Sequence, residues 1–340
     1  MIENNLPQNK SIENKFPLPV VGRFAPSPTG ALHLGNARSF LLAWLSIRSR
    51  NGRLIVRMED LDHPKVKPWA TKAALDDLHW LGLDWDEGPD TNEKEYIQSN
   101  RKAIYQEYLQ QLIDKNLIYP CVCSRNEIEN VQSAPHREDK RLIYNGMCRG
   151  RFESWDVAAA TMGEGRLPVW RFKLENHGNA SFYDELCGEC NADYQLDIGD
   201  FALARDKCGA GYTFAHVVDD YLMGITEVLR GDDLLEATHS HIVIQKALNF
   251  PTPKYFHVPL VVAEDGRRLA KRHGDTRIAT LREKGFSAKQ VVGILAWWCG
   301  WADFGEELTP EDLLSRFNWE SFNKEAAILT PRVKEFFGYE

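Results

Sequence analysis

The sequence predicts an α/β fold, a doubly wound parallel sheet of the Rossmann type, and three observations support this prediction. An apolar strand ending at Phe24 runs into Ala25-Pro26-Ser27-Pro28-Thr29-Gly30, where two prolines and a glycine are incompatible with helix or strand pairing. The segment after this turn has apolar residues at helical spacing. A second strand, from Leu54 to Met58, follows the helix, as in a parallel β-α-β unit.

The ends of these elements predict a polar crevice. His33-Leu34-Gly35-Asn36 opens the helix, and backbone N–H groups at a helix start, with an imidazole beside them, form an anion site. The second strand delivers Glu59, Asp60 and Asp62 to its carboxyl end, where open parallel sheets bind ligands. One crevice is therefore expected to hold an anion site and a set of carboxylates.

Composition limits the class of protein. The chain has 340 residues, 43% of them hydrophobic and 26% charged, which is typical of a globular protein with two or three domains. No apolar run approaches the ~20 residues of a membrane span. Residues 1–16 are polar and lack the apolar core of a signal peptide, so we expect a flexible extension on a cytoplasmic, monomeric protein with no membrane partner.

Charge and cysteine content narrow the class further. A net charge of −8 argues against a DNA-sliding protein, but a local basic face would still allow RNA binding. The seven cysteines do not form a disulfide framework. Alternating apolar and basic residues between Leu167 and Ala204 predict strands, whose basic residues either contact a phosphate backbone or are simply solvated; the candidates are Arg149, Arg151, Arg171 and Lys173.

Further helices and strands are expected along the chain. Apolar spacing predicts helices over residues 71–81 and 97–117, and a strand over 257–262. The C-terminal region is expected to contain only helices, over residues 288–299, 310–317 and 323–337.

Three cysteines predict a zinc site. Cys121 and Cys123 flank a tight turn, and Cys148 lies in a distant polar loop, so their thiolates supply most of a tetrahedral shell. The fourth ligand is either His136 or Tyr144, and a closed four-ligand site would be structural. The alternative, three reduced cysteines in a small core, is disfavoured by the Arg-rich loop around Cys148. Cys187, Cys190 and Cys208 form a weaker candidate for a second metal site.

The crevice motifs resemble the class I glutamyl-tRNA synthetases. That family has A-P-S-P-T-G, a His-x-Gly-His signature whose last histidine is Asn36 here, and a strand ending like Met58-Glu59-Asp60-Leu61-Asp62. The longest match spans residues 211–231, and Lys271 stands at the lysine of the second signature loop, with Arg268 and Ala270 replacing two of its residues. The resemblance covers roughly residues 20–290 and implies a Rossmann-type domain split by an insertion.

The resemblance also implies the roles of individual residues. L-Glutamate would be bound by Arg23, Ala25, Ser27, Glu59, Tyr212 and Arg230. ATP, with Mg²⁺, would be bound by His33, Gly35, Asn36 and Lys271, of which His33 and Lys271 would act in catalysis. Asp219 and Asp220 are interpreted as helix-start carboxylates rather than a metal pair, and His216 as either a pocket residue or a core histidine.

Two features resemble a paralogous family, the glutamyl-queuosine tRNA(Asp) synthetases. These have C-x-C followed by Y-x-x-x-C, which implies zinc bound by Cys121, Cys123, Tyr144 and Cys148. Residues 272–340 are also too few for the anticodon-binding region of full-length glutamyl-tRNA synthetases, which leaves a small helical stem-contact region. The implied activity is tRNA-independent activation of glutamate and its transfer to queuosine in the anticodon stem-loop of tRNA(Asp). A shortened synthetase charging tRNA(Glu) and a non-catalytic RNA-binding relative are the alternatives.

The expected organisation has five parts. They are a polar extension (1–19), the first half of the catalytic domain (20–119), the insertion with the zinc site (120–200), the second half of the catalytic domain (201–265), and the signature loop with the C-terminal helical region (266–340).

Overall fold

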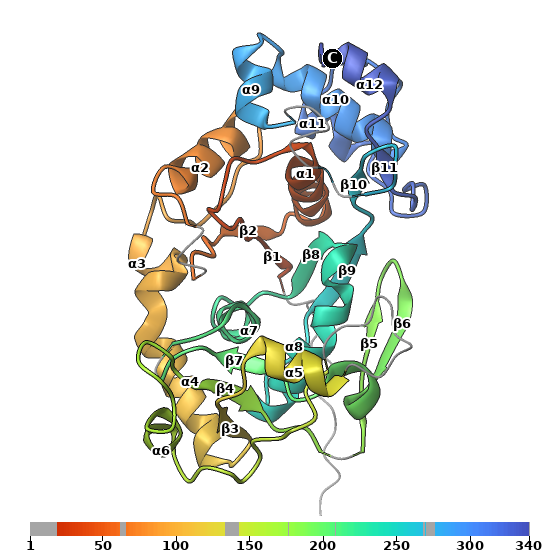
Figure 1. Ribbon diagram of the computed structural model, residues 1–340. Helices are drawn as coiled ribbons and strands as arrows, with labels where there is room; N and C mark the ends of the chain where they lie inside the picture. The colour runs from red at the N-terminus through yellow and green to blue at the C-terminus, as the bar shows by residue number, and fades with distance from the viewer. Residues whose placement is uncertain are drawn as a thin grey trace, which may run out of the picture.

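A computed structural model describes residues 19–61, 66–132, 143–175, 177–207, 209–267, 269 and 276–339. Four strands lie side by side at its centre (Figure 1): β2 (Arg53–Val56), β1 (Val21–Phe24), β8 (Glu227–Gly231) and β9 (Lys254–Val258). β1 and β2 pair in parallel, as do β8 and β9. Each pair is connected by one long helix, α1 (Leu34–Arg48) in the first and α8 (Leu235–Leu248) in the second.

The α/β class is confirmed, but one continuous, doubly wound parallel sheet is not what forms. In the described ranges the strands make separate hydrogen-bonded groups of mixed direction: β1-β2, β6-β5-β9-β8, β3-β4-β7 and β10-β11. Between β1 and β8, two hydrogen bonds of Thr226 take the place of a regular β-ladder. Its N–H donates to the Val21 carbonyl at 2.9 Å, and its Oγ1 accepts from the Val21 N–H at 2.9 Å.

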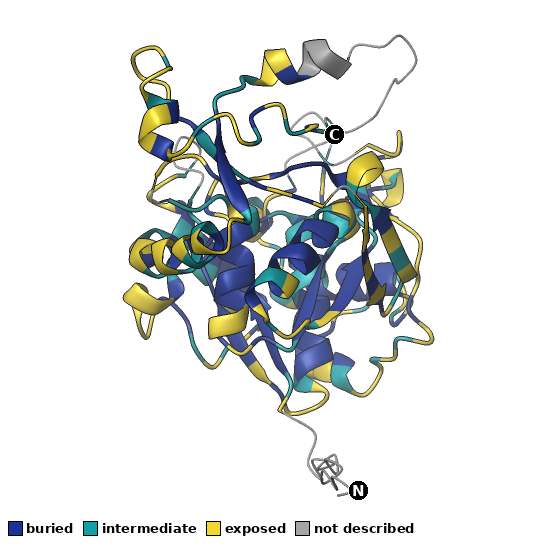
Figure 2. Cartoon of the chain, turned by 90° about the horizontal axis from the view of Figure 1, so that it is seen from below, coloured by how far each residue is buried: buried dark blue, intermediate teal, exposed yellow. Residues whose placement is uncertain are grey.

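The central helices are apolar on most of their surface because other elements cover them. In α1, Leu41, Leu42 and Leu45 are fully buried, and most of α8 is buried too. Figure 2 shows buried helices and strands at the centre of the molecule and exposed residues on the elements around them. Helices with polar and apolar faces, such as α2 (Ala70–Trp80), lie further out and match the sequence prediction for residues 71–81.

The long helix predicted over residues 97–117 begins late. The structure has α3 (Glu93–Tyr96), a 3₁₀ turn (Gln98–Arg101) and then α4 (Lys102–Asp114). Met58 interrupts the helical ladder, because its N–H donates to the Tyr96 carbonyl at 2.8 Å and its carbonyl accepts from the Gln98 N–H at 3.1 Å. Asp60 then caps the 3₁₀ turn by accepting from the Ser99 N–H at 2.7 Å.

Residues 118–204 form two antiparallel groups, consistent with the predicted strands. The first consists of β3 (Ile118–Cys121), β4 (Val169–Phe172) and β7 (Ala202–Ala204), with α5 (Arg125–Gln132) and α6 (Trp155–Ala159) between β3 and β4. The second is the hairpin of β5 (Asn179–Asp184) and β6 (Gly188–Asp193), which a π-helix (Tyr194–Ile198) follows. Asp184 pairs with Tyr255, so the hairpin extends the central strands at β9.

The C-terminal region differs from the prediction in its strands and in the length of two helices, since those predicted over residues 310–317 and 323–337 are shorter. The strand predicted over residues 257–262 stops at Val258, because Pro259 has no N–H to donate, and a short β10 (Val261–Val262) follows. β10 pairs with β11 (Ala327–Ile328), where only helix was expected. The remaining helices are α9 (Ile278–Glu283), α10 (Ala288–Cys299), α11 (Pro310–Leu314) and α12 (Pro331–Phe336). No helix in the described ranges has the length and hydropathy to cross a bilayer.

Candidate functional site

A cavity of about 600 Å³ lies at the carboxyl ends of β1 and β8, next to the N-terminus of α1 and the first turn of α7 (Tyr212–Leu222). Every described residue that the sequence assigned to amino-acid or ATP binding lines it: Arg23, Ala25, Ser27, His33, Gly35, Asn36, Glu59, Tyr212 and Arg230. Lys271, Asp62 and His136 lie outside the described residues. Segments that are far apart in the chain therefore converge on one cavity.

The start of α1 is capped by its own residues. His33 Nδ1 accepts from the N–H groups of Gly35 at 3.1 Å and Asn36 at 3.4 Å, while Asn36 Oδ1 accepts from the His33 N–H at 3.3 Å. This reciprocal capping box satisfies amides that the sequence analysis assigned to an anion. Direct contact of those two amides with a phosphate would require the His33 ring to turn away.

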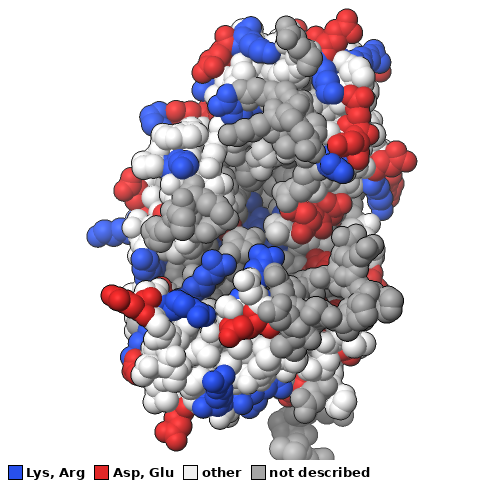
Figure 3. Space-filling model, viewed as in Figure 1, with Lys and Arg blue, Asp and Glu red and all other residues white. Residues whose placement is uncertain are grey.

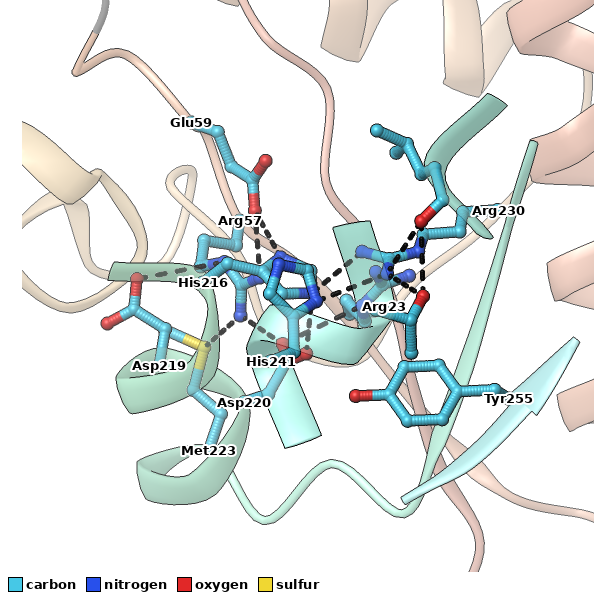
Figure 4. Close-up of polar contacts among 12 residues, drawn as sticks. Arg23, Arg57, Glu59, His216, Asp219, Asp220, Met223, Arg230, His241 and Tyr255 are labelled. Carbon is cyan, nitrogen blue, oxygen red and sulfur yellow. Dashed lines mark hydrogen bonds and ion pairs between the residues drawn. The ribbon is translucent and has the colours of Figure 1, made fainter. Parts of the chain in front are cut away.

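Glu59 enters the cavity wall from the end of β2 and is held in its ionised form. Its Oε1 accepts from Arg57 Nη2 at 2.8 Å and lies 3.2 Å from His216 Nδ1 (Figure 4). Burial by itself would raise the pKa of Glu59, but the hydrogen bond with His216 and the charge of Arg57 outweigh it and lower the pKa to about 2. The cavity therefore presents a fixed negative charge at neutral pH.

Arg57, which the sequence analysis did not assign to the site, connects Glu59 to α7. It is fully buried, donates to Asp220 Oδ1 at 2.7 Å and lies 3.8 Å from Asp219 Oδ2. The only sequence signal was a basic residue inside an otherwise apolar strand.

Asp219 and Asp220 lie toward the end of α7, so their interpretation as helix-start carboxylates is wrong. Asp219 instead accepts bonds from Gln98, Arg101 and Tyr105.

His216 lies between the charged side chains and does not line the cavity, as expected for a core histidine. Each ring nitrogen faces one arginine and one carboxylate: Nδ1 faces Arg57 and Glu59, and Nε2 faces Arg230 at 3.3 Å and Asp220 at 3.1 Å. Burial lowers the pKa of His216 even though the two carboxylates oppose this shift. The ring is therefore neutral near pH 7.

Two guanidinium groups and a phenol complete the wall. Arg23 Nη1 donates to the Leu229 carbonyl at 3.1 Å, and Arg230 follows Leu229 on β8. Tyr212 is partly exposed at the mouth of the cavity, but desolvation by the surrounding wall and the Glu59 charge raise its pKa to about 12, so its hydroxyl stays protonated. One carboxylate beside two guanidiniums suits a small ligand that carries both an ammonium and a carboxylate group.

The predicted metal ligands form a second cluster, which lies against β3. The sulfur atoms of Cys121, Cys123 and Cys148 lie within 4.8 Å of one another. The Tyr144 hydroxyl is 3.3 Å from Cys121 Sγ and 3.4 Å from Cys123 Sγ. Three neighbouring cysteine sulfurs are the kind of ligand that a structural zinc site uses, and the Tyr144 oxygen is the fourth polar atom beside them.

The other cysteines and the basic candidates have different surroundings. In the described ranges only Cys121, Cys123 and Cys148 form a group of three or more ligating side chains close enough to share a metal ion, and Cys208 lies outside these ranges. Arg149 pairs with Asp200, and Arg171 lies over the Tyr144 ring with 4.0 Å between the guanidinium carbon and the ring centroid. Of the basic residues proposed for RNA contact, only Arg151 and Lys173 are exposed.

Comparisons with known proteins match this geometry. Residues 19–330 match the family described as tRNA synthetases class I (E and Q), catalytic domain. The chain is 40% identical to a glutamyl-Q tRNA(Asp) synthetase of Rhodopirellula baltica, over 94% of this chain and 97% of the relative. It is 43% identical to the corresponding protein of Symbiobacterium thermophilum, over 87% of this chain and 92% of that protein.

Longer relatives match as well. A glutamate–tRNA ligase of Natranaerobius thermophilus is 40% identical, over 90% of this chain but 63% of the ligase. The crystal structure of a glutamate–tRNA synthetase from Elizabethkingia anophelis superposes with a TM-score of 0.78 at 26% identity, over 94% of this chain and 70% of that one. With its family match, its fold and its charged cavity in agreement, the chain belongs to the class I tRNA synthetases (E and Q).

Proposed function

We propose that the chain activates L-glutamate with ATP, without tRNA, and transfers the glutamate to queuosine in the anticodon stem-loop of tRNA(Asp). The observation that carries this proposal is the cavity in which Arg23, Glu59, Tyr212 and Arg230 meet the start of α1. The relatives that match over nearly their whole length carry the name of that activity. Because ATP and tRNA are cytoplasmic substrates, the protein would act in the cytoplasm, and its monomeric state stays a prediction.

The amino acid would bind by charge complementarity. Glu59, which is ionised and held in place by Arg57, would accept a hydrogen bond from the ammonium group of the substrate. Arg23 and Arg230 would donate to the side-chain carboxylate, and the Tyr212 hydroxyl would add a neutral hydrogen bond. Ala25 and Ser27, on the turn after β1, would close the cavity around the substrate.

ATP would occupy the part of the cavity near α1. His33, Gly35 and Asn36 line this part, and Lys271 follows β10 in sequence. A carboxylate oxygen of glutamate would attack the α-phosphorus of ATP, and the bond from that phosphorus to the β-phosphate oxygen would break. Glutamyl-adenylate and pyrophosphate result. His33, Lys271 and a Mg²⁺ ion bound with ATP would offset the charge that develops on the phosphates.

Transfer would follow at the same cavity. Queuosine would attack the activated carbonyl carbon, and AMP would leave. Figure 3 shows Lys and Arg side chains along the lower border of the hollow on this face, where a phosphate backbone would approach. The segment 120–200 would be the insertion that separates the two halves of the catalytic domain.

A structural zinc ion would hold the insertion together through Cys121, Cys123, Tyr144 and Cys148. The residues present fit this ion, because three sulfurs lie within 4.8 Å of one another and the Tyr144 hydroxyl lies 3.3 and 3.4 Å from two of them. With all four positions filled by protein, the ion would stabilise the fold and leave no site for a reacting water.

The test is pyrophosphate exchange with glutamate and ATP in the absence of tRNA, followed by transfer of labelled glutamate. We expect exchange without RNA, and label on queuosine-containing tRNA(Asp) but not on tRNA(Glu). Label on tRNA(Glu) alone would establish the shortened synthetase instead. Absence of both exchange and label would indicate a non-catalytic RNA-binding relative.

A further inference from the structure

Arg230 lines the cavity, but side chains that do not line it hold its guanidinium group from behind. Nε donates to His257 Nε2 at 3.1 Å, and Nη2 donates to Thr238 Oγ1 at 2.7 Å. Nη2 also lies 3.1 Å from His241 Nδ1. A guanidinium can only donate hydrogen bonds, so each imidazole nitrogen that bonds to it must be an unprotonated acceptor.

This requirement fixes the proton of His257. Because Nε2 accepts from Arg230, the ring proton must be on Nδ1, which lies 2.7 Å from Asp184 Oδ2. The side chains of both Asp184 and His257 are fully buried. Burial alone would raise the pKa of Asp184, but the hydrogen bond with His257 and two backbone N–H bonds outweigh it, so this pKa is lowered. An ionised Asp184 therefore accepts a hydrogen bond from Nδ1–H, and this bond selects the tautomer that accepts from Arg230.

Asp184 is itself rigidly held. Its Oδ1 accepts from the N–H groups of Leu186 at 3.0 Å and Cys187 at 2.9 Å, which form the turn of the β5–β6 hairpin. Its Oδ2 also accepts from the His257 N–H at 3.1 Å. The carboxylate therefore connects the hairpin turn, the neighbouring strand β9 and the cavity arginine.

We propose that Asp184 and His257 are positioning residues that set the orientation of Arg230 toward the side-chain carboxylate of the bound amino acid. The identity of that ligand rests on the proposed function. The hydrogen bonds from Asp184 through His257 to Arg230 do not depend on the proposed function. The ligand and the hydrogen bonds are therefore tested by separate experiments.

The first experiment needs no substrate. Protein labelled with ¹⁵N-histidine is studied by NMR between pH 6 and 8, with the His257→Gln variant identifying the signals of His257. We expect a neutral ring protonated on Nδ1 in the native protein. In Asp184→Asn, whose amide N–H₂ faces the ring, the proton is expected to move to Nε2. A native ring protonated on Nε2 would overturn the proposal.

The second experiment measures pyrophosphate exchange. Asp184→Asn is expected to raise the KM for glutamate on the order of tenfold, the effect of losing one charged hydrogen bond, while the KM for ATP stays within about twofold. Glu189→Gln, the same chemical change at an exposed position of this hairpin, is the control and should leave both constants unchanged. An active native protein whose Asp184→Asn variant keeps the native KM for glutamate would refute the positioning role.

A second pair of variants covers the case in which Asp184→Asn does not fold. In His257→Gln the amide oxygen can take the place of Nε2 and still accept from Arg230, whereas His257→Phe offers no acceptor. We expect the KM for glutamate to rise in His257→Phe and to be restored toward the native value in His257→Gln. Equal values in the two variants would overturn the proposal. If the native protein shows no pyrophosphate exchange, the proposed function is refuted. The hydrogen bonds from Asp184 through His257 to Arg230 are then tested by the NMR experiment alone.

Discussion

The protein contains two buried polar clusters that differ in how their members are satisfied. Around Arg57, positive and negative groups alternate, and the strands and helices supply partners for each of them (Figure 4). Around Tyr144, three sulfurs gather with a phenol oxygen, and the Arg171 guanidinium lies over the Tyr144 ring and beside the Cys121 sulfur. The charged groups of the first cluster have oppositely charged partners within the protein, whereas the second brings together three sulfurs that, under the proposal above, a cation would stabilise.

The largest expected effect is on the charged cluster. Arg57→Met would leave Glu59 and Asp220 buried without their main partner, and we expect the free energy of unfolding to fall by about 3–5 kcal/mol, measured by urea denaturation. Lys72→Met removes an exposed ion pair with Asp76 on α2 and should change it by less than ~1 kcal/mol. If the free energy of unfolding falls by similar amounts in the two variants, the buried ion pairs of Arg57 do not stabilise the fold more than an exposed ion pair does.

The next effect concerns the chemistry at the cavity. Lys271→Ala is expected to slow pyrophosphate exchange on the order of 10²-fold, by analogy with the loss of one transition-state donor. The free energy of unfolding should stay unchanged, which separates this variant from Arg57→Met. An unaltered exchange rate would refute the role proposed for Lys271.

The sulfur cluster is tested by its metal content. Purified native protein is expected to contain about one zinc per chain, and Cys148→Ser to lose it together with roughly 2 kcal/mol or more of stability. Cys187→Ser changes an exposed cysteine outside the cluster and should retain the metal. Elemental analysis with thermal denaturation measures both quantities. Native protein free of zinc would leave the cluster as a small reduced core.

The smallest effect is on pH dependence. Burial and the adjacent Arg230 lower the pKa of His241 well below 6.5, so below pH 6.5 the unfolded chain binds a proton that the folded chain rejects. The free energy of unfolding should therefore fall as the pH drops from 7.0 to 5.5. We expect His241→Asn, which can still accept from Arg230, to remove about 1 kcal/mol of this fall.

Other groups with shifted pKa values do not obscure this comparison. Burial lowers the pKa of His216 and His257 too, which adds to the fall equally in the native protein and the variant. Burial raises the pKa of Asp77 to about 6, which adds stability as the pH falls, but equally in the native protein and the variant. Glu59 loses its contribution only below its ordinary pKa of 4.5, because its folded pKa is about 2. Equal pH dependence in the native protein and His241→Asn, in urea titrations at the two pH values, would show that His241 does not cause the fall.

The cavity residues were predictable because their motifs are local and chemically distinctive. A strand, a turn with two prolines and a helix start fix where Arg23, Ser27 and His33 lie relative to one another. Their position after parallel strands predicts the edge at which ligands bind. By contrast, β11 was predicted as helix, because a two-residue strand has no periodicity of its own and forms only where β10 offers a partner.

The α/β class, the cavity motifs and the cysteine spacing can be predicted from the order of the amino acids, since each depends on residues close together in the chain. The bridge from Arg57 to Glu59 and Asp220, and the contact of Asp184 with His257, become visible only in the folded protein. These pairs join segments of the chain that are distant in sequence, and a lone charged residue carries no sign of the partner it will meet. Burial then makes such partners necessary, because an unpaired charge in the interior is costly.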